Sequence, residues 1–98
     1  MSATLRETVP GEFALSGPLR FETVPGVYAA ARKPFAAHRQ LVVDLAEVSA
    51  CDSAALALVL EWVRMATARG AVLRYRNLPA ALLAIASISD VDGLLPTA

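Results

Sequence analysis

Cys51, Asp52 and Ser53 place a thiol, a carboxylate and a hydroxyl side by side, which is the most chemically suggestive cluster in the sequence. A catalytic thiol needs a neighbouring base or a group that lowers its pKa, and the only histidine, His38, lies well upstream in a polar segment. We therefore interpret Cys51 as a structural thiol and His38 as a solvated side chain. A small enzyme that acts through Cys51 or Asp52 is an alternative interpretation of the chain.

Metal and phosphate chemistry lack the residues they need. Asp44 and Asp52 could approach each other, but no metal-binding signature surrounds them. Gly70 is isolated, so there is no glycine-rich loop to hold a nucleotide phosphate. The sequence predicts no catalytic residue, no metal site and no cofactor.

The simplest role for Asp52 and Ser53 is structural. Both residue types accept hydrogen bonds from the free N–H groups of a helix start, and an aspartate also suits the positive end of the helix dipole. Either residue could therefore cap a helix that begins here.

Composition limits the class of protein. The chain has 98 residues, of which 56% are hydrophobic and 18% charged, so it has room for one small domain and is not disordered. Nine basic residues balance nine acidic ones, which argues against binding to nucleic acid or to an anionic membrane. No apolar run reaches the roughly 20 residues of a membrane span, and we expect no signal peptide and no direct membrane insertion. With one cysteine there is no internal disulfide, and we expect a cytoplasmic protein.

Apolar periodicity and turn residues predict seven elements. Strands are expected at 11–17, 19–21, 41–45 and 72–75, and helices at 24–37, 53–69 and 79–88, with a loop at 49–53 and a tail at 90–98. Pro34 should bend or end the first helix. This order predicts an α/β fold: one domain, residues 1–98 with a core of about 11–96, and a mixed sheet of four or five strands with helices on one side.

A family resemblance rests on the segment from Val43 to Ala57. A strand that ends in Asp-Leu, followed after a short loop by Asp-Ser-x-x-Leu-Ala at a helix start, resembles the STAS domain of anti-sigma factor antagonists and their relatives. The piece Phe21-Glu22-Thr23-Val24-Pro25 resembles one subgroup, the MlaB-like STAS subunit of the Mla-type phospholipid ABC transporter. The resemblance covers roughly residues 11 to 96.

The sequence departs from the antagonists at one position that matters. Their helix typically begins Asp-Ser-Ser-Gly-Leu-Gly, and a partner kinase phosphorylates the second serine. Ala54 stands there in this chain, so the matching hydroxyl is absent and only Ser53 remains as a phosphoacceptor. This difference favours the transporter subgroup over control of a sigma factor.

The long helix carries apolar residues on two sides. At 100° per residue, Leu56, Val59, Leu60 and Val63 share the face that we expect to meet the sheet. The opposite face, with Trp62 at its border, is expected to receive a partner unless the last helix or the tail covers it. The residues predicted to bind this partner are Asp52, Ser53, Ala54, Ala57, Leu58, Glu61 and Met65.

The resemblance implies a non-enzymatic regulatory or stabilising subunit. Its partner would be the ATPase of a phospholipid-transporting ABC complex that maintains outer-membrane lipid asymmetry, and it would lie at the inner membrane through that partner. The alternative is an anti-sigma factor antagonist that docks on an anti-sigma factor without the usual phosphoserine switch.

Overall fold

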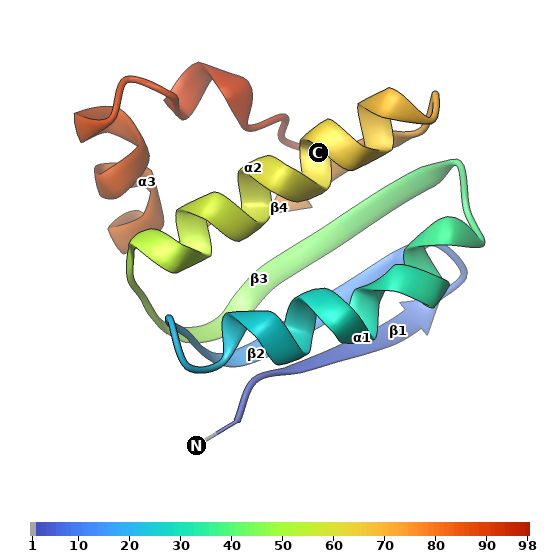
Figure 1. The fold of residues 1–98 in the computed structure, drawn as a ribbon, viewed down its shortest axis with the longest axis horizontal. Helices are drawn as coiled ribbons and strands as arrows, with labels where there is room; N and C mark the ends of the chain where they lie inside the picture. Colours follow the sequence, from blue (N-terminus) through green and yellow to red (C-terminus); the bar gives the residue numbers. More distant parts are fainter. Residues whose placement is uncertain (1) are drawn as a thin grey trace.

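The structure, a computed structural model, describes residues 2–98 and contains one sheet and three α-helices (Figure 1). The elements in chain order are β1 (Thr4–Val9), β2 (Glu12–Leu19), α1 (Val24–Ala36), β3 (Gln40–Cys51), α2 (Ser53–Ala68), β4 (Val72–Arg76), α3 (Ala80–Ile88) and a 3₁₀ turn, η1 (Asp92–Leu94).

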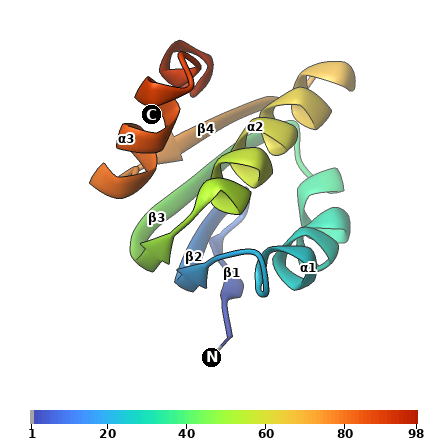
Figure 2. The same cartoon turned by 60° about the vertical axis from the view of Figure 1, so that its left-hand side comes forward.

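The sheet is mixed, and its strands follow the order β1-β2-β3-β4. β1 pairs antiparallel with β2, whereas β2, β3 and β4 are parallel, with α1 and α2 as the connections between them. The helices lie on one face of the sheet, and α2 lies between α1 and α3 in both views (Figures 1 and 2). β1 and β4 are the edge strands, and the edge of β4 is partly covered by the C-terminal segment, where Tyr75 bridges to Thr97.

Alternation along the strands separates a core face from an open face. Phe13 and Leu15 of β2 are buried beneath the helices, as are Leu41, Val43 and Leu45 of β3. The residues between them point to the opposite side, which no helix covers. On that open face Arg76 pairs with Glu12 at 3.4 Å, and Arg6 with Glu47 at 4.0 Å.

The predicted α/β class, the order of elements and the single domain with a mixed sheet are confirmed, with four strands. The first two strands differ from the prediction. The strand predicted at 11–17 is β2 (Glu12–Leu19), the one predicted at 19–21 lies at the end of β2 and in the connection after it, and β1 (Thr4–Val9) was not predicted. Gly11 makes the turn between β1 and β2 at φ +83°, where a Cβ would meet the Gln40 carbonyl oxygen at 2.8 Å.

β3 is also longer than predicted. It continues through residues 49–51, where a loop was predicted, because it stays paired with β2 as far as Leu19 and Cys51 despite two irregularities in register. Pro34 lies inside the last turn of α1, and the helix ends two residues later at Ala36.

Candidate partner-binding surface at the start of α2

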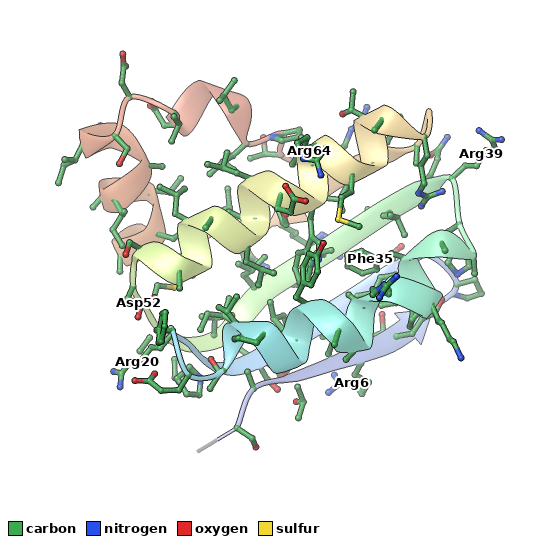
Figure 3. All side chains as sticks on the ribbon, in the orientation of Figure 1. Arg6, Arg20, Phe35, Arg39, Asp52 and Arg64 are labelled. Carbon is green, nitrogen blue, oxygen red and sulfur yellow. The ribbon has the colours of Figure 1, made fainter. Side chains whose placement is uncertain are left out.

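Asp52 joins two segments that are distant in the sequence. One carboxylate oxygen, Oδ1, accepts a hydrogen bond of 2.9 Å from the Ala54 N–H and so caps α2. The other, Oδ2, accepts a bond of 3.0 Å from the Phe21 N–H in the connection between β2 and α1. Figure 3 shows Asp52 beside this connection, at the N-terminal end of α2. The carboxylate therefore fixes the connection to the helix start.

These hydrogen bonds keep Asp52 ionised. The N–H group of Phe21 has the largest effect in lowering the pKa of the Asp52 carboxyl, and the N–H groups of Ala54 and Ala55 and the charge of Arg20 act in the same direction. A carboxylate held in this way serves structure and is a poor general base. Asp52 rather than Ser53 is the cap.

The connection that Asp52 holds presents an exposed aromatic ring. The Thr23 hydroxyl donates to the Pro18 carbonyl at 2.6 Å and accepts from the Arg20 N–H at 3.0 Å, which closes the turn. Phe21, in this turn, is 78% exposed. Phe21 is not among the binding residues predicted from the sequence, although an aromatic residue inside a polar turn was a usable signal.

Several of the predicted binding residues lie together on the outer side of α2. Ser53 and Ala57 are exposed, and Ala54 is half-buried next to the cap. Glu61, also half-buried, accepts two hydrogen bonds from the Arg64 guanidinium at 2.7 and 2.6 Å. We call Phe21, Ser53, Ala54 and Ala57 the α2-start surface.

The prediction that Leu58 faces outward is wrong, because its side chain is 3% exposed. Trp62, placed at the border, is 2% exposed, whereas Leu60 and Val63, assigned to the sheet face, are only half-buried. The buried face is thus turned by roughly a quarter of the circumference from the one expected at 100° per residue. The physical reason is that α2 packs against α3 as well as against the sheet and α1, so its apolar face is wide.

Met65 occupies an intermediate position. It is half-buried, and its sulfur accepts a hydrogen bond of 3.3 Å from the Tyr28 hydroxyl of α1. It therefore contacts α1 rather than standing free on the outer side of the helix.

The remaining chemical candidates are engaged elsewhere. Burial, and after it the charge of Asp52, raises the pKa of the half-buried Cys51 thiol, which makes it a weaker nucleophile at neutral pH. His38 bonds to Glu7 at 2.7 Å, and Asp44 accepts from the Asn77 side chain at 3.1 Å. Within residues 2–98 no three side chains of His, Cys, Asp or Glu come together as a metal site.

Comparisons with known proteins agree with this architecture. The family described as "Mlab, STAS domain" matches residues 4–96. The structure of the anti-sigma factor antagonist SpoIIAA in its unphosphorylated form is similar, with a TM-score of 0.73 and 17% identity over 98% of this chain and 87% of that one. A crystal structure of Mglu matches with a TM-score of 0.61 and 23% identity over 79% of this chain and 20% of that one. A search among curated proteins found no match.

The structural likenesses, at these identities, establish the fold, and the family match establishes the relationship. No helix in the described part of the chain is long and apolar enough to cross a membrane. The sequence match extends over β1 to the C-terminal segment, which is nearly the whole chain. The chain therefore belongs to the MlaB-type STAS domain family.

Proposed function

We propose that this protein is a non-enzymatic subunit that binds the ATPase of a phospholipid-transporting ABC complex and regulates or stabilises it. The observation that carries the proposal is the match of the MlaB-type family over residues 4–96. The α2-start surface supports it, because it combines small residues with one exposed aromatic ring on a connection held by hydrogen bonds. An aromatic anchor beside small residues is a common centre of a protein–protein interface.

The engagement of the polar side chains supports a role without catalysis. Asp52 is occupied by backbone N–H groups, and the Cys51 thiol has a raised pKa. In this proposal the ATPase supplies nucleotide hydrolysis, and other subunits handle the lipid. The protein is cytoplasmic and lies at the inner membrane through its partner.

The test is co-purification from the native host with an affinity tag on this chain. We expect an ABC ATPase and its permease to be recovered in a fixed ratio. Ala57→Asp should reduce the recovery by at least tenfold, because a carboxylate buried in an apolar contact is left unpaired. Ala29→Asp is the matched control, since Ala29 is also an exposed alanine but lies on α1, away from the α2-start surface.

The same experiment separates this function from the alternative. An anti-sigma factor antagonist would use the same surface, where Ser53 offers an exposed hydroxyl and Ala54 does not. Recovery of an anti-sigma factor of the kinase type instead of an ATPase would replace our proposal with that one. Equal recovery of the ATPase by Ala57→Asp and the wild type would move the interface away from the start of α2.

A further inference from the structure

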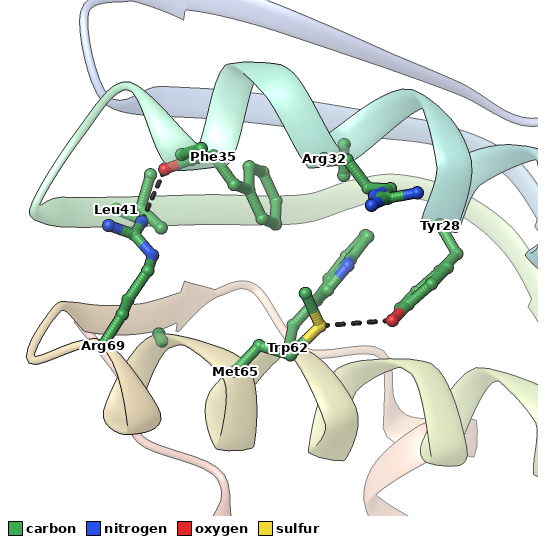
Figure 4. A pocket seen from close by; sticks show the side chains of 10 residues that line it. Tyr28, Arg32, Phe35, Leu41, Trp62, Met65 and Arg69 are labelled. Atoms are coloured by element: carbon green, nitrogen blue, oxygen red, sulfur yellow. Dashed lines mark hydrogen bonds between the residues drawn. The ribbon is translucent and has the colours of Figure 1, made fainter.

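A small pocket lies between α1 and α2, at some distance along α2 from its capped start (Figure 4). Its volume is about 130 Å³, and its wall is mostly apolar. The side chains that line it include Tyr28, Arg32, Phe35, Trp62, Met65 and Arg69. None of them belongs to the α2-start surface, so the pocket needs an explanation of its own.

Two side-chain bridges hold the helices on either side of the pocket. At one end the Tyr28 hydroxyl donates to the Met65 sulfur at 3.3 Å. At the other end the Arg69 guanidinium donates to the carbonyl oxygens of Phe35 and His38, the latter at 2.7 Å. Figure 4 shows the Tyr28–Met65 bond and the bond from Arg69 to the Phe35 carbonyl, with the rings of Phe35 and Trp62 between them. The space is thus preformed, as ligand pockets usually are.

The wall of the pocket suits an aromatic ring. Phe35 and Trp62 meet edge to face, with ring centroids 4.9 Å apart and an interplanar angle of 64°, and Phe13 continues the cluster at 5.0 Å from Phe35. A further ring can join such a cluster in the same geometry. The volume is close to that of a protein cavity that accommodates benzene, about 150 Å³.

The rim of the pocket is positively charged. Arg32 is exposed, lines the pocket (Figure 4), and takes part in none of the ion pairs found within residues 2–98. Arg69 lies at the far end. Glu61, which precedes Trp62 in α2, is already paired with Arg64. A guanidinium without a partner favours a carboxylate, to which it can donate two parallel hydrogen bonds.

We propose that this pocket binds a small aromatic carboxylate, with the ring against Phe35 and Trp62 and the carboxylate on Arg32. The probe is 3-phenylpropanoate, compared with the neutral 3-phenylpropanol and the cationic 3-phenylpropylamine. Trp62 is the only tryptophan of the chain, so its fluorescence reports on the pocket directly. We expect a saturable change in emission and a rise in Tm with the acid, with affinity about tenfold lower for the alcohol and lower still for the amine.

Four variants of the full chain test the two halves of the proposal. Arg32→Gln should weaken binding of the acid about tenfold and leave binding of the alcohol unchanged, whereas Lys33→Gln, at the adjacent exposed position outside the pocket, should change neither. Ala36→Leu, at an exposed position on the pocket wall, should fill the opening and abolish saturation. Ala29→Leu is its control, because Ala29 is exposed on α1 but does not line this pocket.

Three results would overturn the proposal. The first is the absence of saturable binding of 3-phenylpropanoate to the folded wild type. The second is equal affinity for the acid, the alcohol and the amine, which would leave Arg32 without a role. The third is an Ala36→Leu protein with unchanged Tm that binds as tightly as the wild type. None of these results depends on the identity of the partner at the α2-start surface.

Discussion

At the scale of single residues, Asp52 has two structural roles, of which only one was predictable from the sequence. Capping of the helix was predictable from residue type, because aspartate before an apolar helix is a common start signal. The second bond, to the Phe21 N–H, joins positions 31 residues apart and depends on the packing of α1 beside α2. Local sequence contains no information on it.

We predict that Asp52→Ala lowers Tm by about 5 °C, because the cap and the bond to the connection are lost together. Asp52→Asn should lose less, since the amide oxygen still accepts one bond.

The pKa of Asp52 is lowered in the folded protein, so its stabilising effect is present above the ordinary aspartate pKa of about 3.9 and is lost as pH falls below it. The Tm difference between wild type and Asp52→Asn should therefore shrink between pH 5 and pH 2 in thermal melts. A difference that stays constant over this range would contradict the role of the ionised form.

We predict that Ser53→Asp keeps a Tm near that of the wild type but reduces co-purification of the ATPase. Ser53 is exposed in the first turn, where an added negative charge suits the helix dipole. In an interface the same carboxylate must lose its water without gaining a partner. Ser53→Ala is the control and should bind almost normally. A stable Ser53→Asp protein that binds its partner as tightly as the wild type would remove Ser53 from the interface.

At the scale of elements, the orientation of α2 decides which substitutions unfold the protein. We predict that Leu58→Ala lowers the free energy of unfolding by about 2–5 kcal/mol, because the side chain is buried in the core. Leu60→Ala should cost about 1 kcal/mol, since Leu60 is only half-buried and loses less contact. Urea denaturation of the two variants gives the comparison. Equal losses would contradict the facing of α2 described above.

The order of elements was predictable from the sequence, whereas the facing of α2 was not. Strand and helix periods and the stop at Gly70 follow from local residue types. The Leu, Val, Trp and Met residues of α2 are spread around so much of the helix that periodicity predicts no single apolar face. Only packing against α1 and α3 selects one. The strand β1 was missed for a related reason. Its residues are mostly exposed, and only pairing with β2 makes them a strand.

Of the two surfaces with proposed roles, one was predictable from the sequence and the other was not. Asp52, Ser53 and Ala57 could be placed in a site because they follow one another along a helix start. The pocket beside Arg32 could not be foreseen, because its wall comes from α1, α2 and β3 at once. Its small volume depends on two bridges between side chains of different helices.

At the scale of the whole molecule, Tyr75 connects the sheet to the helix layer. Its side chain in β4 is fully buried, and its hydroxyl donates a bond of 2.7 Å to the Val59 carbonyl oxygen in α2. We predict that Tyr75→Phe lowers the free energy of unfolding by about 1 kcal/mol at pH 7, because this one hydrogen bond is lost while the packing remains.

The Tyr75 contribution should depend on pH in the alkaline range. Burial raises the pKa of the Tyr75 hydroxyl well above the ordinary value of about 10, so the folded protein holds a proton that the unfolded chain releases. The stabilising effect is therefore present below pH 10 and decreases as pH rises above it. Urea denaturation from pH 8 to pH 11 should show the advantage of the wild type over Tyr75→Phe decreasing. An advantage that grows with pH would contradict the buried, protonated state.

The edge strand β1 has a consequence for how copies of this protein behave at high concentration. Two copies that extended their sheets through antiparallel β1 strands would be related by a two-fold axis perpendicular to the sheet. That symmetry places a given side chain on the same face of the joined sheet in both copies. The residue at the centre of the overlap must therefore lie opposite the same residue of the other copy. In the two registers with the greatest overlap of Thr4–Val9, Arg6 would oppose Arg6 or Glu7 would oppose Glu7. Like charges directly opposite each other oppose pairing, so this strand protects the protein from sheet-to-sheet aggregation while leaving its edge open to water.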